Sequence, residues 1–186
     1  SAPGVYYEDV AMRDTQTPFL NAQFDPARSA DLFAGSGQDF AAIAAAADAS
    51  KPVASFPLTL RLKAAVAAKR VALSSPNLVA VMPGSDPKLA KDYVVLSAHL
   101  DGYGVGTPIK GDAIYNGALD NASGVASLIE IAKALKASKV KPKRSILFTI
   151  VTGEEKGLLG SRYFARRPTV PSKSIVADLN FDMALP

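Results

Sequence analysis

The 186-residue chain contains no cysteine, which excludes disulfide bonds, cysteine-ligated zinc and a thiol nucleophile. It has no run of about 18 apolar residues, so the sequence predicts no membrane span. Its 21 basic and 17 acidic residues form no basic stripe with aromatic platforms, which argues against a nucleic-acid partner. The first residues resemble neither a signal peptide nor a transit peptide. A hydrophobic fraction of 48% is enough for a buried core.

Histidine is nearly absent as well. The single histidine, His99, stands in "YVVLSAHLDG", where an apolar run ends and the carboxylate of Asp101 follows two positions later. Taken alone, this pattern is typical of a surface histidine beside a turn. The carboxylates elsewhere in the chain favour a different interpretation.

The first third of the chain has weak periodicity. Residues 1–35 predict irregular chain with short strands. An alanine-rich stretch over 36–49 predicts a helix, with Ser36 accepting from backbone N–H groups and Asp39 in the first turn. Leucines that alternate with polar residues predict a half-buried strand over 58–63.

From residue 77 onward, buried strands alternate with helices. The predicted elements are a strand over 77–82, a strand over 93–98, a glycine-rich loop over 102–117, a helix that begins at Asp120 or Ser123, a strand over 145–152, a short helix over 157–166 and a strand over 175–181. This order predicts an α/β fold, a mostly parallel sheet with helices on both faces.

Acidic residues and the histidine follow the predicted strand ends. In open parallel sheets, ligands bind beyond the carboxyl ends of the strands. One rim is therefore predicted to gather six side chains, which are His99, Asp101, Asp120, Glu154, Glu155 and Asp182. Carboxylates so close together repel one another unless a cation lies among them. Imidazole with carboxylates suits zinc, and also manganese or cobalt.

Two local spacings refine this prediction. The carboxylate of Asp101 can reach the far ring nitrogen of His99 and fix its tautomer. The adjacent side chains of Glu154 and Glu155 point in different directions, so one can bind metal while the other holds a water as general base. The alternative for this pair is a solvated helix start, where acids oppose the helix dipole.

Four stretches carry a resemblance to a known family: "SAHLD", "YNGALDNASGVASLIEIA", "ILFTIVTGEEKGLLGSRYF" and "LNFDM". They resemble the co-catalytic zinc peptidases, which include bacterial leucyl aminopeptidases, glutamate carboxypeptidase II and the non-enzymatic transferrin receptor. The resemblance covers residues 77–186. It implies an enzyme with two zinc ions that hydrolyses peptide substrates, usually removing the N-terminal residue.

The resemblance also implies a role for each of the six rim residues. His99 and Asp182 would bind one zinc, Asp120 would bridge both, Glu155 would bind the second, Glu154 would be the general base, and Asp101 would orient His99.

One departure from the family concerns the second zinc, which in the family takes a further histidine downstream of the "LNFDM" position. This chain has no second histidine and ends four residues after Asp182. We therefore expect it to be a portion of a longer enzyme, with the missing C-terminal segment as its partner, and to be inactive by itself.

The family often carries an inserted protease-associated domain. Residues 1–72 are predicted to be the end of such a smaller, β-rich insert and its return segment, ahead of the peptidase portion, residues 73–186. Family habit implies secretion or the periplasm.

Two function classes stay open, a zinc aminopeptidase and a non-catalytic, receptor-like binding member of the same fold. The intact predicted ligand set and Glu154 favour the enzyme. Ser97, Ser123 and Ser161 are not credible nucleophiles, because the only histidine is better placed as a metal ligand. "GYGVG" lacks the lysine and the spacing of a phosphate-binding loop.

Overall fold

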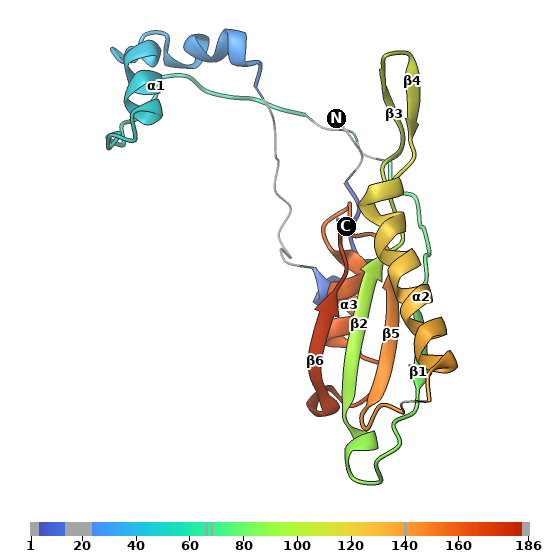
Figure 1. Ribbon diagram of the computed structural model, residues 1–186. Coiled ribbons are helices and arrows are strands. Elements are labelled where there is room, and N and C mark those ends of the chain that lie inside the picture. Colours follow the sequence, from blue (N-terminus) through green and yellow to red (C-terminus); the bar gives the residue numbers. More distant parts are fainter. Residues whose placement is uncertain (1–3, 14–23, 66, 68, 140, 184–186) are drawn as a thin grey trace. The chain divides into compact units, whose positions relative to one another are not determined.

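A computed structural model describes residues 4–13, 24–65, 67, 69–139 and 141–183. The chain forms two compact units, one of residues 1–14 with 72–186 and one of residues 15–71 (Figure 1). Residues 1–14 thus belong to the larger unit, and the predicted domain boundary between residues 72 and 73 stays a prediction. The assignment of the first part to a protease-associated domain stays a prediction.

The larger unit contains a four-stranded sheet in the order β1-β5-β2-β6. Strand β2 is parallel to both β5 and β6, and β1 is antiparallel to β5. The sheet is therefore mostly parallel, as predicted, and β2, β5 and β6 end at one rim (Figure 1). The strands are β1 Leu78–Met82, β2 Tyr93–His99, β5 Ser145–Val151 and β6 Ile175–Asn180.

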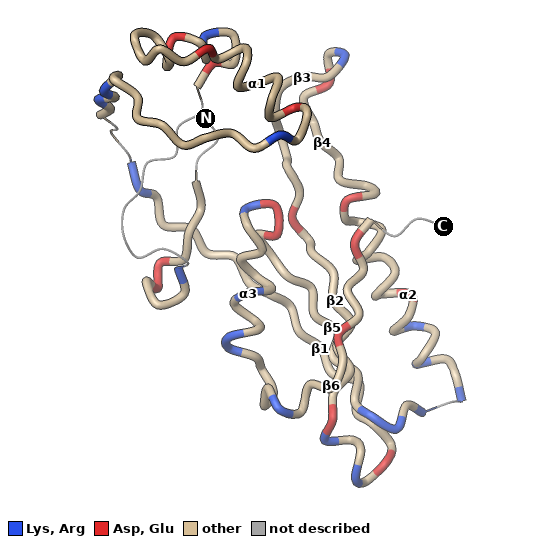
Figure 2. The backbone as a smooth tube through the Cα atoms, turned by 90° about the vertical axis from the view of Figure 1, so that its left-hand side faces the viewer, with Lys and Arg blue, Asp and Glu red and all other residues tan. Residues whose placement is uncertain are grey.

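Helices cover both faces of this sheet, as predicted. The helix α2, Ser123–Ala137, lies on one face and α3, Leu159–Arg166, on the other (Figures 1 and 2). Under α2, Leu128 packs against Leu96 and Ala98 in the main apolar cluster. Burial on two faces explains why β2 is a continuous apolar run rather than an alternating one.

The glycine-rich segment predicted as a loop contains a hairpin. Its strands, β3 Gly104–Ile109 and β4 Asp112–Tyr115, pair antiparallel. At the tip, Lys110 and Gly111 have φ angles of 52° and 88°, which is the backbone that two-residue hairpin turns require. The loop prediction was wrong here because it overlooked this Lys-Gly turn.

The N-terminal residues of the larger unit pack against α3. The turn η1, Val10–Met12, buries Met12, and Arg166 Nη1 donates to the carbonyl of Met12 at 2.7 Å. The hydroxyl of Tyr7 donates to the carbonyl of Leu159. Two further short helical turns connect the strands, η3 Leu89–Lys91 and η5 Ser172–Ser174.

The smaller unit contains the turn η2, Pro26–Phe33, and the helix α1, Phe40–Asp48. This helix begins later than predicted, because Asp39 rather than Ser36 caps it by accepting from Ala41 N at 2.9 Å. The strand predicted over 58–63 is wrong: these residues form no strand, and Leu62 is 79% exposed. The residues described in this unit include no strand at all.

No helix in the described parts of the chain is both long and apolar enough to cross a membrane.

Candidate metal centre

His99 is the last residue of β2 and its side chain is 3% exposed. Its Nδ1 lies 3.0 Å from the carbonyl oxygen of Asp101. Its Nε2 lies 3.0 Å from Asp120 Oδ1 and 3.5 Å from Asp182 Oδ1. The backbone of the strand end thus holds one ring nitrogen, and the other faces two carboxylates.

Asp120 reaches this ring from the wide turn η4, Ala118–Ala122, which leads into α2. The next residue, Asn121, is buried and ties this turn to the end of β6. Its Nδ2 donates to the carbonyl of Phe181 at 2.8 Å, and its Oδ1 accepts from Gly124 N at 3.0 Å and from Met183 N at 3.3 Å. Asn121 therefore brings its neighbour Asp120 close to Asp182.

His99, Asp120 and Asp182 form a group whose potential ligand atoms all lie within 4.8 Å of one another. The two carboxylate side chains are 39% and 40% exposed, so the group opens to solvent on the side away from the buried imidazole. The sequence predicted that these three residues would meet at the rim, and they do.

Glu154 and Glu155 lie in the turn after β5, and Asp101 holds that turn. Asp101 Oδ1 accepts from Glu154 N at 2.9 Å, and its Oδ2 accepts from Glu155 N at 3.1 Å. Asp101 meets His99 mainly through its carbonyl, since its carboxylate is 3.8 Å from Nδ1. Asp101 thus connects the imidazole to the turn that carries both glutamates.

The two glutamates face different surroundings, as predicted for adjacent residues. Glu154 Oε2 lies 4.0 Å from His99 Nε2. Glu155 lies outside the His99 group, and its carboxylate raises the pKa of the nearby Tyr103 hydroxyl. Glu155 Oε1 is buried and has no hydrogen-bond partner among the described residues, which is uncommon for a carboxylate oxygen.

Charges in the cluster shift two pKa values upward. Burial lowers the pKa of His99, but the carbonyl of Asp101 and the carboxylates of Glu154 and Asp182 outweigh it, so the pKa is raised. Desolvation raises the pKa of Glu154, and His99 offsets this only in part. The raised pKa of His99 shows that the surrounding carboxylates favour positive charge at the imidazole, whereas the raised pKa of Glu154 comes mainly from its burial.

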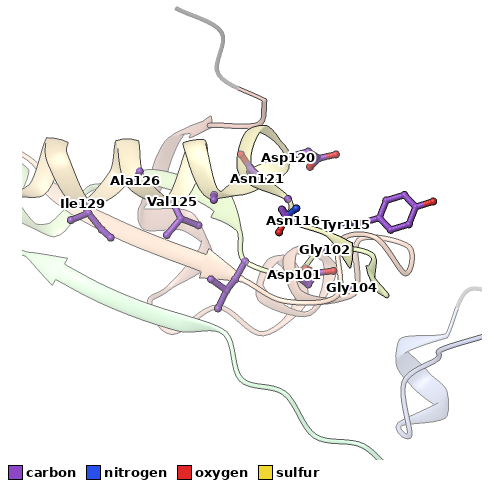
Figure 3. Close-up of a pocket in the computed structure, with 13 residues that line it drawn as sticks. Asp101, Gly102, Gly104, Tyr115, Asn116, Asp120, Asn121, Val125, Ala126 and Ile129 are labelled. Atoms are coloured by element: carbon purple, nitrogen blue, oxygen red, sulfur yellow. The ribbon is translucent and has the colours of Figure 1, made fainter. Parts of the chain in front are cut away.

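A cavity of about 420 Å³ adjoins the cluster, with Asp101 and Asp120 among its lining residues (Figure 3). Helix α2 supplies an apolar wall of Val125, Ala126 and Ile129. The cavity places apolar surface beside the carboxylates, an arrangement common in small-molecule and peptide sites.

Three residues near the cluster were missed in the sequence: Asn121, Tyr103 and Asn77. Asn121 stands in the "LDNASG" motif, directly after a predicted ligand, which was a usable signal. No local signal marked Tyr103 or Asn77. Tyr103 is near Glu155, and Asn77 bonds the residue that follows β5, and in both cases the partner is far away in the sequence.

A buried imidazole among carboxylates, at the rim of a mostly parallel sheet, offers the donor set and the position of a metal-binding site. Residues 77–186 match the sequence model of Peptidase family M28. Because this match covers more than half of the chain, the chain belongs to that family.

Relatives agree with this assignment. A probable zinc metalloprotease of Pyrenophora tritici-repentis is 39% identical over 110 residues, which are 58% of this chain and 24% of that protein. Leupeptin-inactivating enzyme 1 of Streptomyces exfoliatus is 33% identical over 108 residues, 58% of this chain and 22% of that enzyme. The chain therefore spans about a quarter of the length of these relatives.

Solved structures include a Peptidase M28 precursor from Shewanella amazonensis. It is 30% identical, with a TM-score of 0.48, over 57% of this chain and 22% of that one.

Proposed function

We propose that this protein acts as a zinc-dependent aminopeptidase that removes N-terminal residues from peptide substrates. The observation that carries the proposal is the convergence of His99, Asp120 and Asp182 within ligand distance of one another, in a chain of Peptidase family M28. The zinc metalloproteases and leucine aminopeptidases among its relatives support the same reaction class.

The residues present fit zinc. Imidazole and carboxylate oxygens are donors that zinc accepts, and three carboxylates around one imidazole need a cation to offset their repulsion. The buried, unpartnered Oε1 of Glu155 is an independent sign of a missing positive partner. We propose that His99 and Asp182 hold one zinc, that Asp120 bridges two, and that Glu155 holds the second.

Bound zinc would polarise the scissile carbonyl and lower the pKa of water enough for it to lose a proton and act as the nucleophile at neutral pH. The chain's own residues would do the rest. Glu154 Oε2, near the metal group but outside its ligand set, would take the proton from the attacking water and deliver it to the departing amine. Asp101 would keep the imidazole of His99 and the glutamate turn in register through its carbonyl and its carboxylate.

We also propose secretion or the periplasm as the compartment, on the habit of the resembled family. Cell fractionation with an antibody against the protein tests this.

The activity can be tested by peptidase assays on the protein expressed from its complete gene. With zinc present, it is expected to hydrolyse aminoacyl-p-nitroanilides, to lose this activity on chelation and to regain it when zinc is restored. Substrates with a blocked N-terminus should not react. A zinc-loaded, folded protein that cleaves none of these substrates would favour the non-catalytic, receptor-like member of the fold instead.

A further inference from the structure

The turn that carries Glu154 and Glu155 has a second anchor, on the side away from Asp101. Asn77, the residue before β1, accepts a hydrogen bond from Thr152 N on Oδ1 at 3.1 Å. Its Nδ2 donates to the carbonyl of Gly160 at 2.8 Å. One amide side chain therefore holds the residue that opens the turn and a residue in the first turn of α3.

The position of Asn77 follows from the sheet. The β1–β5 ladder pairs Leu78 with Ile150 at this end, so no backbone partner from β1 remains for the residues just after β5. The side chain of Asn77 takes over where the ladder stops. It can do so because an amide offers an acceptor and a donor side by side.

The two ends of the turn also contact each other directly. Gly160 N donates to the carbonyl of Thr152 at 2.7 Å. A Cβ on Gly160 would overlap Thr152 and lie 2.5 Å from Asn77 Oδ1, so only glycine permits this approach. Inside the closed ends, Glu154 O accepts from Gly157 N and Leu158 N, both at 2.9 Å.

We propose that Asn77 is a positioning residue for the reaction: it clamps Thr152 to Gly160 and so sets where Glu154 and Glu155 stand relative to His99. Asp101 holds the middle of the same turn through two backbone N–H groups, and Asn77 holds its ends. Two anchors on different parts of one turn fix its orientation, whereas a single anchor would leave the turn free to rotate about that point. This role rests on the proposed function, since it concerns the reach of a general base and of a ligand.

A purely structural Asn77 would behave differently from a positioning one. If it only joined β1 to β5, its loss would lower stability and leave turnover per folded molecule unchanged. If it positions the turn, its loss misplaces Glu154 by a fraction of an ångström to about 1 Å, a displacement that can cost up to about 100-fold in rate. Substrate affinity would change little, because Asn77 lies outside the cavity lining.

The experiment uses the protein from its complete gene with Asn77→Ala, Asn77→Asp and the control Ser75→Ala. In the described part of the chain, the Ser75 hydroxyl bonds the side chain of Thr152, Oγ to Oγ1 at 2.7 Å, and not its backbone, so its loss leaves the backbone clamp intact. We expect Asn77→Ala to lower kcat about 10- to 100-fold with KM within about twofold. Asn77→Asp keeps only the acceptor for Thr152 N, so its kcat should lie between those of Asn77→Ala and the wild type. Ser75→Ala should match the wild type.

Amide hydrogen exchange of residues 153–159 in the metal-free protein gives a readout independent of activity. Exchange there should quicken in Asn77→Ala, less in Asn77→Asp, and not in Ser75→Ala. Unchanged exchange in this turn, or a kcat that falls only with the folded fraction, would overturn the proposal. The near-isosteric Asn77→Asp decides the matter if Asn77→Ala does not fold. A wild-type protein without peptidase activity would refute the proposed function, and the exchange data would still decide whether Asn77 holds the turn.

Discussion

At the scale of single residues, the two roles proposed for the adjacent Glu154 and Glu155, general base and zinc ligand, can be tested separately by mutation. Glu154→Gln should lower kcat about 100- to 10,000-fold while zinc content stays unchanged, because the amide cannot accept the proton. Glu155→Gln should lower both kcat and zinc content, because a neutral amide replaces the carboxylate whose buried, unpartnered oxygen we assign to the second zinc. Steady-state kinetics with elemental analysis of each variant measures both effects.

The charge-matched control is Glu130→Gln, which removes one carboxylate from the exposed Glu130–Lys133 pair on α2. It should leave both kcat and zinc content unchanged. Loss of zinc in Glu154→Gln with activity retained by the remaining metal-loaded enzyme would mean that the two roles are reversed.

Gly124 gives a second prediction, for the packing that joins Asp120 to Asp182. A Cβ at this position would overlap the amide of Asn121 and lie 2.5 Å from the carbonyl of Phe181. Gly124→Ala should therefore cost about 1–3 kcal/mol of stability through overpacking and also weaken zinc binding, because it displaces the tie between the two ligand-bearing segments.

Gly102→Ala is the matched control, since a Cβ there meets nothing within 4 Å. Its stability should stay within about 0.5 kcal/mol of wild type. Urea unfolding and zinc titration compare the two variants. Equal zinc affinity in both would show that Asn121 does not set the spacing of Asp120 and Asp182.

The chemistry-bearing residues were predictable from the sequence because parallel strands end at a common rim. His99, Asp120 and Asp182 converge there as expected. The residues that hold them were not predictable, since a buried Asn121 and an exposed asparagine look alike in a sequence. The carbonyl contact from Asp101 to His99 escaped prediction for a similar reason: spacing identifies the residue but not which of its oxygens faces the ring.

At the scale of elements, strands buried on both faces were the easiest to predict. The prediction placed β2 and β5 within one residue of their observed ends, because continuous apolar runs bounded by polar turns leave few alternatives. The alternation over 58–63 failed, because a period of two marks a strand only where a neighbouring strand and a surface to cover exist. Leu58, Leu60 and Leu62 are all exposed instead.

The turn η1 provides a prediction at this scale. Met12 is 3% exposed, and the carbonyl of the same residue accepts from Arg166 on α3. Met12→Ala should lower the free energy of unfolding by about 2–5 kcal/mol, because it leaves a cavity where residues 4–13 pack against the rest of the larger unit.

Val10 begins the same turn but is 47% exposed, so Val10→Ala should change stability by less than about 0.5 kcal/mol. Chemical denaturation followed by circular dichroism measures both. A Met12→Ala variant as stable as Val10→Ala would show that the N-terminal segment contributes no stability to α3 and the sheet.

At the scale of the whole molecule, the two units differ in how well the sequence predicts their structure. The unit with the sheet has a regular alternation of strands and helices and a family match. In the unit of residues 15–71, short helical segments and irregular chain give few periodic signals. The ring centroid of Phe33 lies 5.2 Å from that of Phe40 and 6.1 Å from that of Phe56, with the rings tilted. Such ring contacts form only after the chain reverses direction, and no local sequence pattern predicts that reversal.

The last prediction concerns zinc and the stability of the protein expressed from its complete gene. Carboxylates gathered around His99 repel one another in the metal-free protein, and a cation that binds only the folded state adds a free energy of RT ln(1 + [L]/Kd). At a zinc concentration of about 1,000 times Kd, this gain is about 4 kcal/mol, so the thermal midpoint should rise on adding zinc and fall on chelation. Asp120→Asn should lose most of this rise, because Asp120 is the residue proposed to contact both ions. Glu130→Gln, with the same change in charge on an exposed face of α2, should keep it. Differential scanning calorimetry in matched buffers measures the shifts. A zinc-induced rise of equal size in Asp120→Asn and Glu130→Gln would place the stabilising ion somewhere other than the His99 group.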